Sequence, residues 1–452
     1  MYEAAWNVTF SETEILNALE EEREITIYSQ TGEQRRDLIY HMRLEDEEKW
    51  LFIAHCDPPE RLDGKDCRFD KVKIVVKGSY KPTFYDTTTG NIEEVHYILK
   101  NGNTIFTRGC YPLDSLLLRL TPCTSKDIVP EVEVQKKQVM EEAVRVPDLV
   151  EYDRQEPNVV VMDLCDWSTD GENWRFREEI LQIDKKIRQE LHWPLADGID
   201  VQPWCIPAKK TSKFLYLRYE IESEIEADCL LGYERLEELW QNGEQVEIQK
   251  MGYYVDKAIH TLKLPRLRKG KNEIVVRVPI SERISLESCY LIGEFGVRVE
   301  GSSAVITETP KQVAFGSITE QGLPFYGGAV TYKIPFTCRE GTLGITTDYY
   351  NGALIGAKLD GREIGRIVLP PYTLVIPEVS EGGHLLELIL YPSRINTFGA
   401  LHMCTPVTWK GPNMWYCERN GWAYEYQLTD VGIMKKPVLT VRLEPEDVVQ
   451  NN

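Results

Sequence analysis

The residues best suited to ligand chemistry lie between positions 396 and 422. This stretch combines aromatic rings with amide and imidazole groups: Trp409, Trp415, Tyr416, Trp422, Asn396, His402 and Asn413. An aromatic ring can stack on the apolar C–H face of a pyranose, and polar neighbours can hydrogen-bond its hydroxyls. The stretch is therefore a candidate carbohydrate contact. The alternative is that the aromatics pack the last module and that Asn396 and His402 shape a loop.

A second group of polar side chains surrounds Trp167. It consists of four carboxylates close together in sequence: Asp163, Asp166, Asp170 and Glu172. Oxygen ligands at close spacing suit calcium. However, Arg177 stands where an EF-hand loop counted from Asp166 has its closing glutamate, and no helical pattern precedes the loop. The metal site stays unknown: a structural calcium is the one cofactor that the loop would suit, and a solvated acidic turn is the alternative.

Glycoside hydrolysis needs two carboxylates about 5 to 5.5 Å apart for retention, or about 6.5 to 9.5 Å apart for inversion. With 72 acidic residues in the chain, some pair meets these distances by chance. Asp348, beside two tyrosines, and Glu220, on an expected strand, are the least implausible candidates. Gly-x-Ser-x-Gly, Walker and His-Glu-x-x-His motifs are all missing from the sequence. We therefore assign no catalytic residue.

Composition narrows the class of protein. The chain has 452 residues, 42% of them hydrophobic, which suggests about three domains. Its formal charge of −20 would repel nucleic acid and anionic membrane surfaces, so neither is an expected partner. No apolar run reaches the roughly 18 to 20 residues of a membrane helix, and the first residues do not resemble a signal peptide. The 11 scattered cysteines suit reduced thiols, and we expect a cytoplasmic protein.

An internal repeat indicates two successive β-sandwiches. Each copy has a tyrosine-bearing strand, an Asx-Gly turn and a closing apolar strand, in the first copy 215–219, 241–244 and 269–276, and in the second 330–334, 359–362 and 381–388. Asn242-Gly243 and Asp360-Gly361 supply the positive φ angles of a tight hairpin. The repeat therefore favours β-sandwich modules over a catalytic barrel.

The remaining patterns set the expected boundaries. A capping box at Ser11-Glu12-Thr13-Glu14 and a strand near Ile25 resemble the end of an α/β unit, and strand-like runs follow up to position 120. We predict an α/β remnant with a small antiparallel sandwich over 1–125, an exposed linker over 126–157, and sandwiches over 158–300 and 301–452, meeting near Gly301. An amphipathic helix is expected over 178–191.

Several motifs resemble those of a known enzyme family. They are His41-Met42-Arg43, Leu51 to His55, Phe84 to Gly90, Glu287 to Val297, Gln321 to Gly328, Asn396 to His402, and Trp409 to Pro412. Their order resembles the C-terminal half of α-L-rhamnosidase-type glycoside hydrolases, the family 106 group and its bacterial relatives. Tyr85 stands where that family usually has Trp, and His55 where Asn is common. The resemblance spans about residues 38 to 438 and is most specific in the last module.

In such proteins a catalytic (β/α) barrel precedes β-sandwiches of the galactose-binding-like kind. A barrel needs about 250 residues of alternating strand and helix, and helical patterns here are confined to about two segments. The resemblance therefore implies a mainly β chain ending in two galactose-binding-like jelly-roll sandwiches, with the cleaving residues in a preceding region or a separate subunit. It adds Tyr326 to the carbohydrate-binding candidates Trp409, Trp415, Trp422, Asn396 and His402.

The leading hypothesis is thus a non-catalytic accessory portion of a rhamnosidase-like glycoside hydrolase acting on plant or microbial glycans. Its expected partners are a carbohydrate and a catalytic barrel domain or subunit. Two alternatives stay open. A stand-alone glycosidase would hydrolyse an aryl glycoside as the pure chain, and a free carbohydrate-binding or adhesion module would bind glycans without any catalytic partner.

Overall fold

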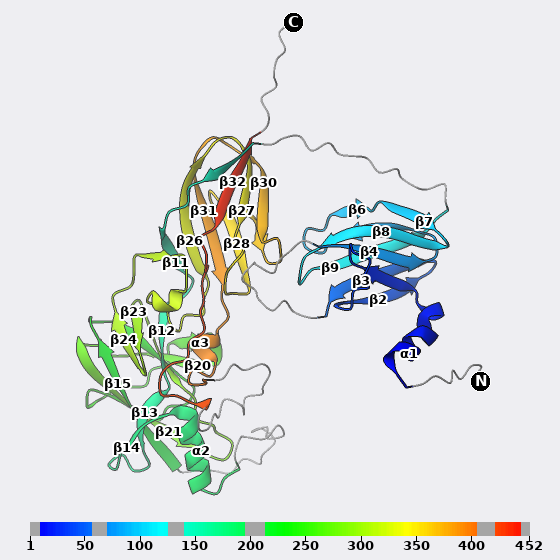
Figure 1. The fold of residues 1–452 in the computed structure, drawn as a ribbon. Coiled ribbons are helices and arrows are strands. Elements are labelled where there is room, and N and C mark those ends of the chain that lie inside the picture. Colours follow the sequence, from blue (N-terminus) through cyan, green and yellow to red (C-terminus); the bar gives the residue numbers. More distant parts are fainter. Residues whose placement is uncertain (1–9, 57–69, 125–139, 195–212, 405–420, 444–452) are drawn as a thin grey trace.

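The computed structural model describes residues 10–56, 70–124, 140–194, 213–404 and 421–443. These residues form six β-sheets, whose pairings are antiparallel apart from a short parallel contact between β15 and β24. Helices are few and short (Figure 1). The mainly β fold class is confirmed. Within the described ranges, no helix is both long and apolar enough to cross a membrane.

The N-terminal sandwich consists of two facing sheets. Their strands are β1 (Ile25–Tyr28), β2 (Leu38–Glu45), β3 (Glu48–His55), β4 (Asp70–Lys77), β5 (Tyr80–Tyr85), β6 (Ile92–Glu94), β7 (Tyr97–Lys100), β8 (Asn103–Cys110) and β9 (Ser115–Pro122). One sheet has the order β1-β4-β8-β7 and the other β2-β3-β9-β5-β6. In β4, buried Val72, Ile74 and Val76 alternate with exposed lysines, which gives the sheet one core face and one solvent face.

Helix α1 (Glu12–Leu19) precedes this sandwich. The N-cap half of the predicted capping box is confirmed, because Ser11 Oγ accepts a hydrogen bond from the Glu14 N–H at 3.3 Å. The next strand, β1, pairs antiparallel with β4. It therefore belongs to the sandwich itself, whereas the sequence placed it in the remnant of an α/β unit.

The chain then enters the C-terminal sandwich before it builds the middle one. Strands β10 (Met140–Val144) and β11 (Leu149–Arg154) lie inside the predicted linker, yet β10 pairs with β32 and β11 with β25 and β26. The linker prediction therefore fails over residues 140–154, and residues 126–139 lie outside the described ranges. The middle sandwich is consequently inserted between two parts of the C-terminal sandwich (Figure 1).

The middle sandwich spans residues 158–307. Its elements are β12 (Asn158–Met162), β13 (Leu164–Ser168), β14 (Arg175–Glu179), α2 (Ile180–Glu190), β15 (Lys213–Ser223), β16 (Cys229–Tyr233), β17 (Glu238–Gln241), β18 (Glu244–Gln245), β19 (Gly252–Tyr254), β20 (Asp256–Lys263), β21 (Gly270–Ile280), β22 (Cys289–Gly293), β23 (Gly296–Glu300) and β24 (Ser303–Thr307). The predicted amphipathic helix is confirmed as α2, which buries Ile180, Ile183 and Ile187 in the core. Gly301 turns β23 into β24 inside this sandwich, so the module boundary follows Thr307.

The C-terminal sandwich combines β10 and β11 with later strands. These are β25 (Gln312–Ala314), β26 (Val330–Cys338), β27 (Gly341–Thr346), β28 (Leu354–Leu359), β29 (Arg362–Ile367), β30 (Thr373–Val379), β31 (Gly382–Tyr391) and β32 (Val438–Leu443). Its sheets have the orders β10-β32-β27-β30 and β25-β11-β26-β31-β28-β29. Both enclose one apolar core that includes Tyr332, Leu343 and Leu388.

The internal repeat corresponds to equivalent strand pairings in the two sandwiches. In the middle sandwich the order is β15-β21-β17-β18, and in the C-terminal sandwich it is β26-β31-β28-β29. The Asx-Gly turns join β17 to β18 and β28 to β29, with φ of 53° and 84° at Asn242 and Gly243 and 51° and 79° at Asp360 and Gly361. The prediction of two repeated sandwiches is therefore confirmed at the level of strand order.

Direct hydrogen bonds join the middle and C-terminal sandwiches. Asn158 is fully buried, and its Nδ2 donates to the carbonyl oxygens of Phe295 and Gly322, each at 2.9 Å. Arg394 forms a bidentate ion pair with Glu156, with N–O distances of 2.7 and 2.8 Å. One end of the middle sandwich is thereby fixed against the chain that follows β31.

Candidate functional site

A small cavity lies where the chain returns from the C-terminal sandwich to the middle one. After β31 and the short helix α3 (Ile395–Phe398), residues 399–404 and 421–428 pack on the middle sandwich, and we call 395–404 with 421–428 the return segment. Leu401 of this segment is buried in the middle core, with Phe398, Tyr426 and Leu428 packed beside it. The cavity measures about 70 Å³. Polar side chains of the middle sandwich and of the return segment line it, among them Asp163, Glu179, Ser288 and His402.

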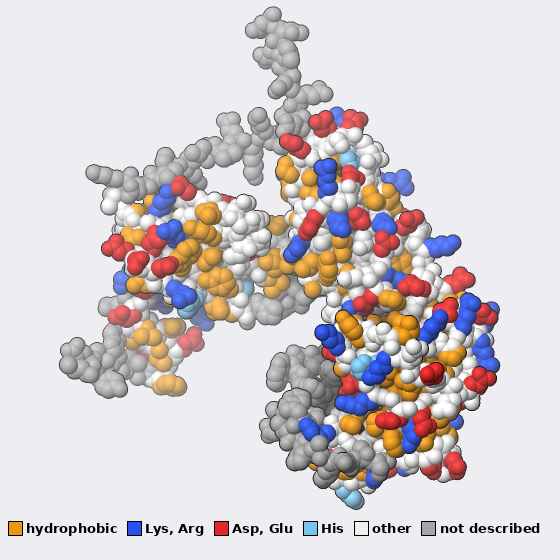
Figure 2. Space-filling model, turned by 180° about the vertical axis from the view of Figure 1, so that it is seen from behind, with side chains coloured by type: hydrophobic (Ala, Val, Ile, Leu, Met, Phe, Trp, Pro, Cys, Tyr) orange, Lys and Arg blue, Asp and Glu red, His pale blue; other side chains and the backbone are white. Residues whose placement is uncertain are grey.

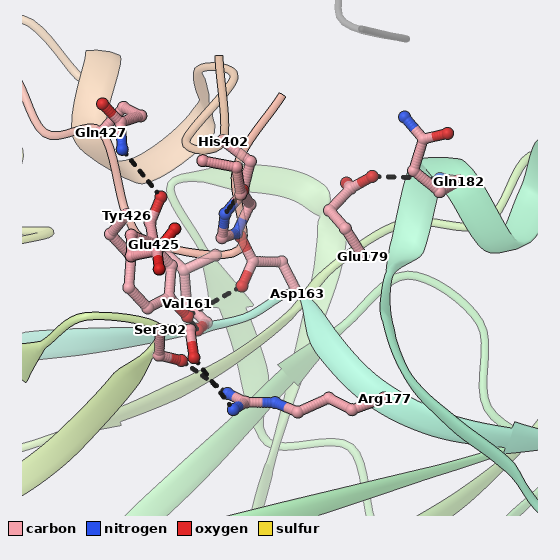
Figure 3. Close-up of polar contacts among 11 residues, drawn as sticks. Val161, Asp163, Arg177, Glu179, Gln182, Ser302, His402, Glu425, Tyr426 and Gln427 are labelled. Atoms are coloured by element: carbon pink, nitrogen blue, oxygen red, sulfur yellow. Dashed lines mark hydrogen bonds and ion pairs between the residues drawn. The ribbon is translucent and has the colours of Figure 1, made fainter. Parts of the chain in front are cut away.

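Asp163 is the central polar group of the site. It lies in the bend between β12 and β13, and only 4% of the residue is exposed. Its Oδ1 accepts a hydrogen bond from Tyr426 Oη at 2.9 Å, and its Oδ2 lies 3.2 Å from His402 Nε2. Both partners come from the return segment, so one carboxylate fixes that segment to the middle sandwich (Figure 3).

The contacts of His402 determine where its protons are. Nδ1 lies 3.0 Å from the carbonyl oxygen of Ala423, which can only accept, so Nδ1 carries a hydrogen. A further proton must then lie between Nε2 and the Asp163 carboxylate. Burial lowers the pKa of His402, but its hydrogen bond to Asp163 and the charges of Asp163 and Glu179 outweigh burial and raise that pKa above its usual range. The raised pKa favours the imidazolium form of His402 beside the Asp163 carboxylate.

Glu179 is a second buried carboxyl group beside this pair. It ends β14 and caps α2, where its Oε2 accepts from the Gln182 N–H at 3.0 Å (Figure 3). Burial, with the nearby charge of Asp163 in addition, raises the pKa of Glu179 to about 7. A substantial fraction of this side chain is therefore neutral at physiological pH and can donate a hydrogen bond.

Trp422 supplies the aromatic wall of the cavity. Its ring centroid lies 5.9 Å from that of His402 and 4.5 Å from that of Tyr424. Its indole Nε1 is buried, and no hydrogen-bond acceptor for it is found among the described residues. A buried donor without an acceptor is costly, so this group is available to a polar ligand or water entering the cavity.

A larger open groove of about 1170 Å³ lies on another side of Tyr426. It runs between the middle and C-terminal sandwiches, and most of its lining is polar: Glu224, Lys269, Arg298, Thr307, Glu308, Glu320, Gln321 and Asp430. Arg298 is held in place by Glu224 and Glu300 at 2.9 and 2.7 Å. Alternating carboxylate, amide and cationic groups of this kind can hydrogen-bond a hydroxylated ligand.

The predicted carbohydrate-binding residues fall in three different places. His402 and Trp422 meet in the small cavity. Asn396 is buried in α3, where its side chain donates to the Thr429 carbonyl at 2.7 Å and accepts from the Thr429 N–H at 2.9 Å. Tyr326 is buried in the C-terminal core, with its hydroxyl 3.2 Å from both Ala329 O and Glu156 N. Trp409 and Trp415, with Tyr416 and Asn413, lie outside the described residues.

The acidic loop around Trp167 does not gather its carboxylates. Asp166 pairs with Arg218 at 2.7 Å, and Asp163 points toward the return segment. The Asp170 carboxylate accepts hydrogen bonds from Ser168 Oγ and from the backbone N–H groups of Glu172 and Asn173. These bonds shape a tight turn. In the part of the chain that the structure describes, no group of three or more His, Cys, Asp or Glu side chains is arranged to hold a metal ion.

The two hydrolysis candidates are surface residues in different sandwiches. Asp348 pairs with Lys435 at 2.9 Å, and Glu220 pairs with Lys271 at 2.8 Å. Sequence reasoning did not single out Glu179 or Tyr426 and did not connect Asp163 with His402. The only local signal for Glu179 is its position just before an amphipathic helix.

Comparison with known proteins gives distant matches. No family model and no curated protein matches the chain. Among solved structures, a rhamnosidase from Novosphingobium sp. PP1Y has a TM-score of 0.42 and 10% identity, over 95% of this chain and 26% of that protein. A Paenibacillus xanthan lyase has a TM-score of 0.14 and 9% identity, over 96% and 40%. A GH31 alpha-xylosidase from Xanthomonas citri has a TM-score of 0.14 and 8% identity, over 90% of this chain and 38% of that protein. This chain spans about a quarter of the rhamnosidase, and TM-scores this low do not define an activity.

Proposed function

We propose that this chain is a non-catalytic, glycan-binding accessory portion of a rhamnosidase-like glycoside hydrolase. The observation that carries the proposal is the wall of the small cavity formed by Trp422. There an aromatic ring, whose indole N–H has no acceptor among the described residues, lies beside the buried groups Asp163, Glu179 and His402. An apolar ring next to fixed donors and acceptors is the combination that binds a sugar substituent and orients it.

The size of the cavity supports binding over cleavage. A volume of about 70 Å³ has room for about five water molecules. It is well below the roughly 300 Å³ at which pockets for whole small ligands begin. A hydroxyl or methyl substituent of a sugar fits such a space, whereas an entire pyranose ring between two carboxylates does not.

The test is direct titration of the purified chain with a glycan panel rich in rhamnose- and galactose-containing oligosaccharides, followed by calorimetry. We expect binding in the micromolar to millimolar range. Trp422→Ala should weaken it by about tenfold or more, since one lost aromatic contact is worth about 1 to 2 kcal/mol. The control is Trp240→Ala, which removes the same side chain from β17. Absence of binding across the panel, or equal affinity in Trp422→Ala, contradicts the proposal.

Glu179 favours the stand-alone glycosidase as a second candidate function. A carboxyl group with a pKa of about 7 near the carboxylate of Asp163 is the kind of pair that divides acid and base roles. This candidate requires the pure chain to release the aryl group from an aryl rhamnoside or galactoside. The rate should fall at least a thousandfold, on the order of a lost general acid, in Glu179→Gln. Glu178→Gln, next to it in sequence, is the matched control.

An accessory portion and a free binding module differ in whether a catalytic partner exists. Adding a barrel subunit encoded beside this gene should raise hydrolysis of a polymeric glycan more than hydrolysis of an aryl glycoside. The gain should vanish with Trp422→Ala. If no such barrel is encoded nearby and the chain alone binds glycan, the free binding module is the better description.

A further inference from the structure

The two sheets of the N-terminal sandwich present very different faces to solvent. On the outer face of the β1-β4-β8-β7 sheet, exposed Lys71, Lys73 and Lys77 alternate with buried core residues, as in an ordinary solvated sheet. On the outer face of the β2-β3-β9-β5-β6 sheet, large apolar side chains are exposed instead: Ile39 at 56%, Phe52 at 40% and Ile92 at 62%. Figure 2 shows hydrophobic side chains gathered on this sandwich.

The strand register places Phe52 and Ile92 in one continuous row, and Ile39, opposite Ala54, belongs to the next row on the same face. His41 lies opposite Phe52, Phe52 opposite Leu117, Leu117 opposite Tyr85, and Tyr85 opposite Ile92. Residues directly opposite in antiparallel strands share a face, so this row crosses all five strands of the sheet. It is apolar on β3, β9, β5 and β6 and ends in His41 on β2. An apolar row on a face that normally carries polar groups marks an interaction surface.

A second row beside it carries charge of opposite sign at its two ends. It runs Arg43, Trp50, Arg119, Thr83, Glu94 across the same five strands. Arg119 in the centre is neutralised by Glu48 at 2.6 Å. Arg43 on β2 and Glu94 on β6, both exposed, are left at opposite edges of the sheet. Glu94 uses Oε1 for Lys81, which leaves Oε2 for another donor.

We propose that this face binds the same face of a second copy of the chain. A two-fold axis parallel to the central strand β9 places the β2 edge of one copy over the β6 edge of the other. Arg43 of each copy then faces Glu94 of the other, Phe52 faces Tyr85, and the two Leu117 side chains meet at the axis. The same operation brings the two Arg119 side chains together at the axis, where each is neutralised by Glu48 of its own copy. The edge charges and the apolar row are complementary under this single operation, as an isologous interface requires.

The area of the face suits a reversible dimer. Five strands about 4.8 Å apart and up to eight residues long, at about 3.4 Å each, cover on the order of 650 Å² per copy, or about 1,300 Å² in total. That is near the lower limit of specific interfaces, so we expect a dissociation constant of about 1 to 100 μM. The inference goes beyond the proposed function, because it does not depend on the cavity at Trp422.

Side-chain contacts on the face favour a protein partner over a glycan. The centroid of the Trp50 ring lies 5.1 Å from that of Tyr85, and the Arg119 guanidinium lies 6.0 Å from the Trp50 centroid. These aromatic faces are therefore partly covered by their own neighbours. The exposed apolar residues that the two edges place on this face, Ile39 and Ile92, are aliphatic and offer no ring for sugar stacking.

The test is analytical ultracentrifugation of the full chain from about 1 to 200 μM. We expect the mass to rise from 52.2 kDa toward twice that value. Phe52→Asp should abolish the dimer, and Arg43→Glu should weaken it at least tenfold. The charge swap Arg43→Glu with Glu94→Arg should restore it, which a variant that merely unfolds cannot do. The control Ile98→Asp alters a residue, 46% exposed, on the other sheet and should leave the dimer intact.

Three outcomes overturn the proposal. One is a monomer at all concentrations. Another is a dimer that resists Phe52→Asp or dissociates in Ile98→Asp. The third is a monomeric chain that binds glycan and loses that binding in Phe52→Asp, because the face would then be a sugar platform. Trp422→Ala should leave the dimer unchanged, so failure of this proposal and failure of the glycan-binding proposal are separate results.

Discussion

Asp163 and His402 are 239 positions apart in the chain, yet their side chains lie 3.2 Å from each other and both residues are buried. Asp163 comes from the middle sandwich, and His402 comes from the segment that returns from the C-terminal sandwich. A charge pair this well buried is costly to break from one side, because the remaining charge loses its partner without regaining water. The pair should therefore control how firmly the return segment is held.

Asp163→Asn should destabilise the middle sandwich by about 3 kcal/mol, the lower end of what loss of one partner of a buried pair costs. The asparagine still accepts from Tyr426 but no longer balances an imidazolium. Calorimetry of the full chain should show the transition of this sandwich lowered by about 6 to 12 °C. Asp166→Asn, which removes only the half-exposed pair with Arg218, should lower it by less than about 4 °C. Equal shifts in the two variants would contradict a special role for Asp163.

The pKa of His402 gives the same pair a pH signature. The pKa of His402 is higher in the folded chain than in the unfolded chain. The pair therefore contributes its full stability at pH values below the unfolded-state pKa, and this stability is lost as the pH rises through the folded-state pKa. In Asp163→Asn the hydrogen bond and the charge of Asp163 no longer oppose burial, so the pKa of His402 should fall below its wild-type value. Proton–carbon NMR titration of the ring, assigned by comparison with His402→Gln, measures both values. A higher pKa in the variant than in the wild type would refute the ion pair.

Glu179 makes a separate pH prediction. Its pKa rises from 4.5 in the unfolded chain to about 7 in the fold, so its contribution to stability is lost as pH increases from about 5 to about 8. The loss is up to about 3 kcal/mol. Glu179→Gln keeps an acceptor for the Gln182 N–H but cannot ionise, so it should match wild type near pH 5 and exceed it at pH 8. Melting curves across this range measure the difference. Glu178→Gln should retain the wild-type pH dependence, and the same slope in Glu179→Gln would rule out the assignment.

The repeated sandwiches were predictable because their signals are local. Alternating strands and the two Asx-Gly turns are each written within a few residues, and the equivalent strand orders follow from them. Strand β10 was not predictable, because Met140-Glu141-Glu142-Ala143-Val144 resembles an exposed acidic segment. Its pairing with β32 is made almost 300 positions later, at Val438–Leu443. A polar edge strand identifies itself only through such a partner.

The candidate site was predictable in its residue types and not in its geometry. Trp422 and His402 were recognisable as an aromatic and a polar group near each other in sequence. The groups that complete the cavity, Asp163 and Glu179, belong to another sandwich. Among the sequence candidates, Asn396 and Tyr326 have the right chemistry but use their polar atoms on the backbone, which only the folded chain reveals.

The two equivalent turns should respond alike to mutation. Gly243 and Gly361 have φ of 84° and 79°, and a Cβ at either position would meet no atom within 4 Å. Alanine is therefore penalised only by backbone strain, about 1 kcal/mol at each turn, which lowers the transition of the affected sandwich by about 2 to 4 °C. Gly383→Ala is the control, since that position is also uncrowded and its φ is not in the positive range. Unequal effects at the two turns would mean that the repeats are not energetically equivalent.

Asn158 should determine whether the middle and C-terminal sandwiches unfold together. Its amide donates to Phe295 in the middle sandwich and to Gly322 in the connection that leads into β26. Asn158→Ala removes the amide donor from the Phe295 carbonyl, whereas the Gly322 carbonyl still accepts from the Val297 N–H at 2.9 Å. The loss costs about 1 to 3 kcal/mol. Asn158→Asp should cost at least as much, because an ionised carboxylate cannot donate. In calorimetry we expect wild type to show one joint transition for these two sandwiches and both variants to show two. Asn173→Ala, in the exposed turn after Asp170, should leave the joint transition unchanged. If the transition stays joint in Asn158→Ala, then the Arg394–Glu156 ion pair and the packing of Phe398 couple the two sandwiches without help from Asn158.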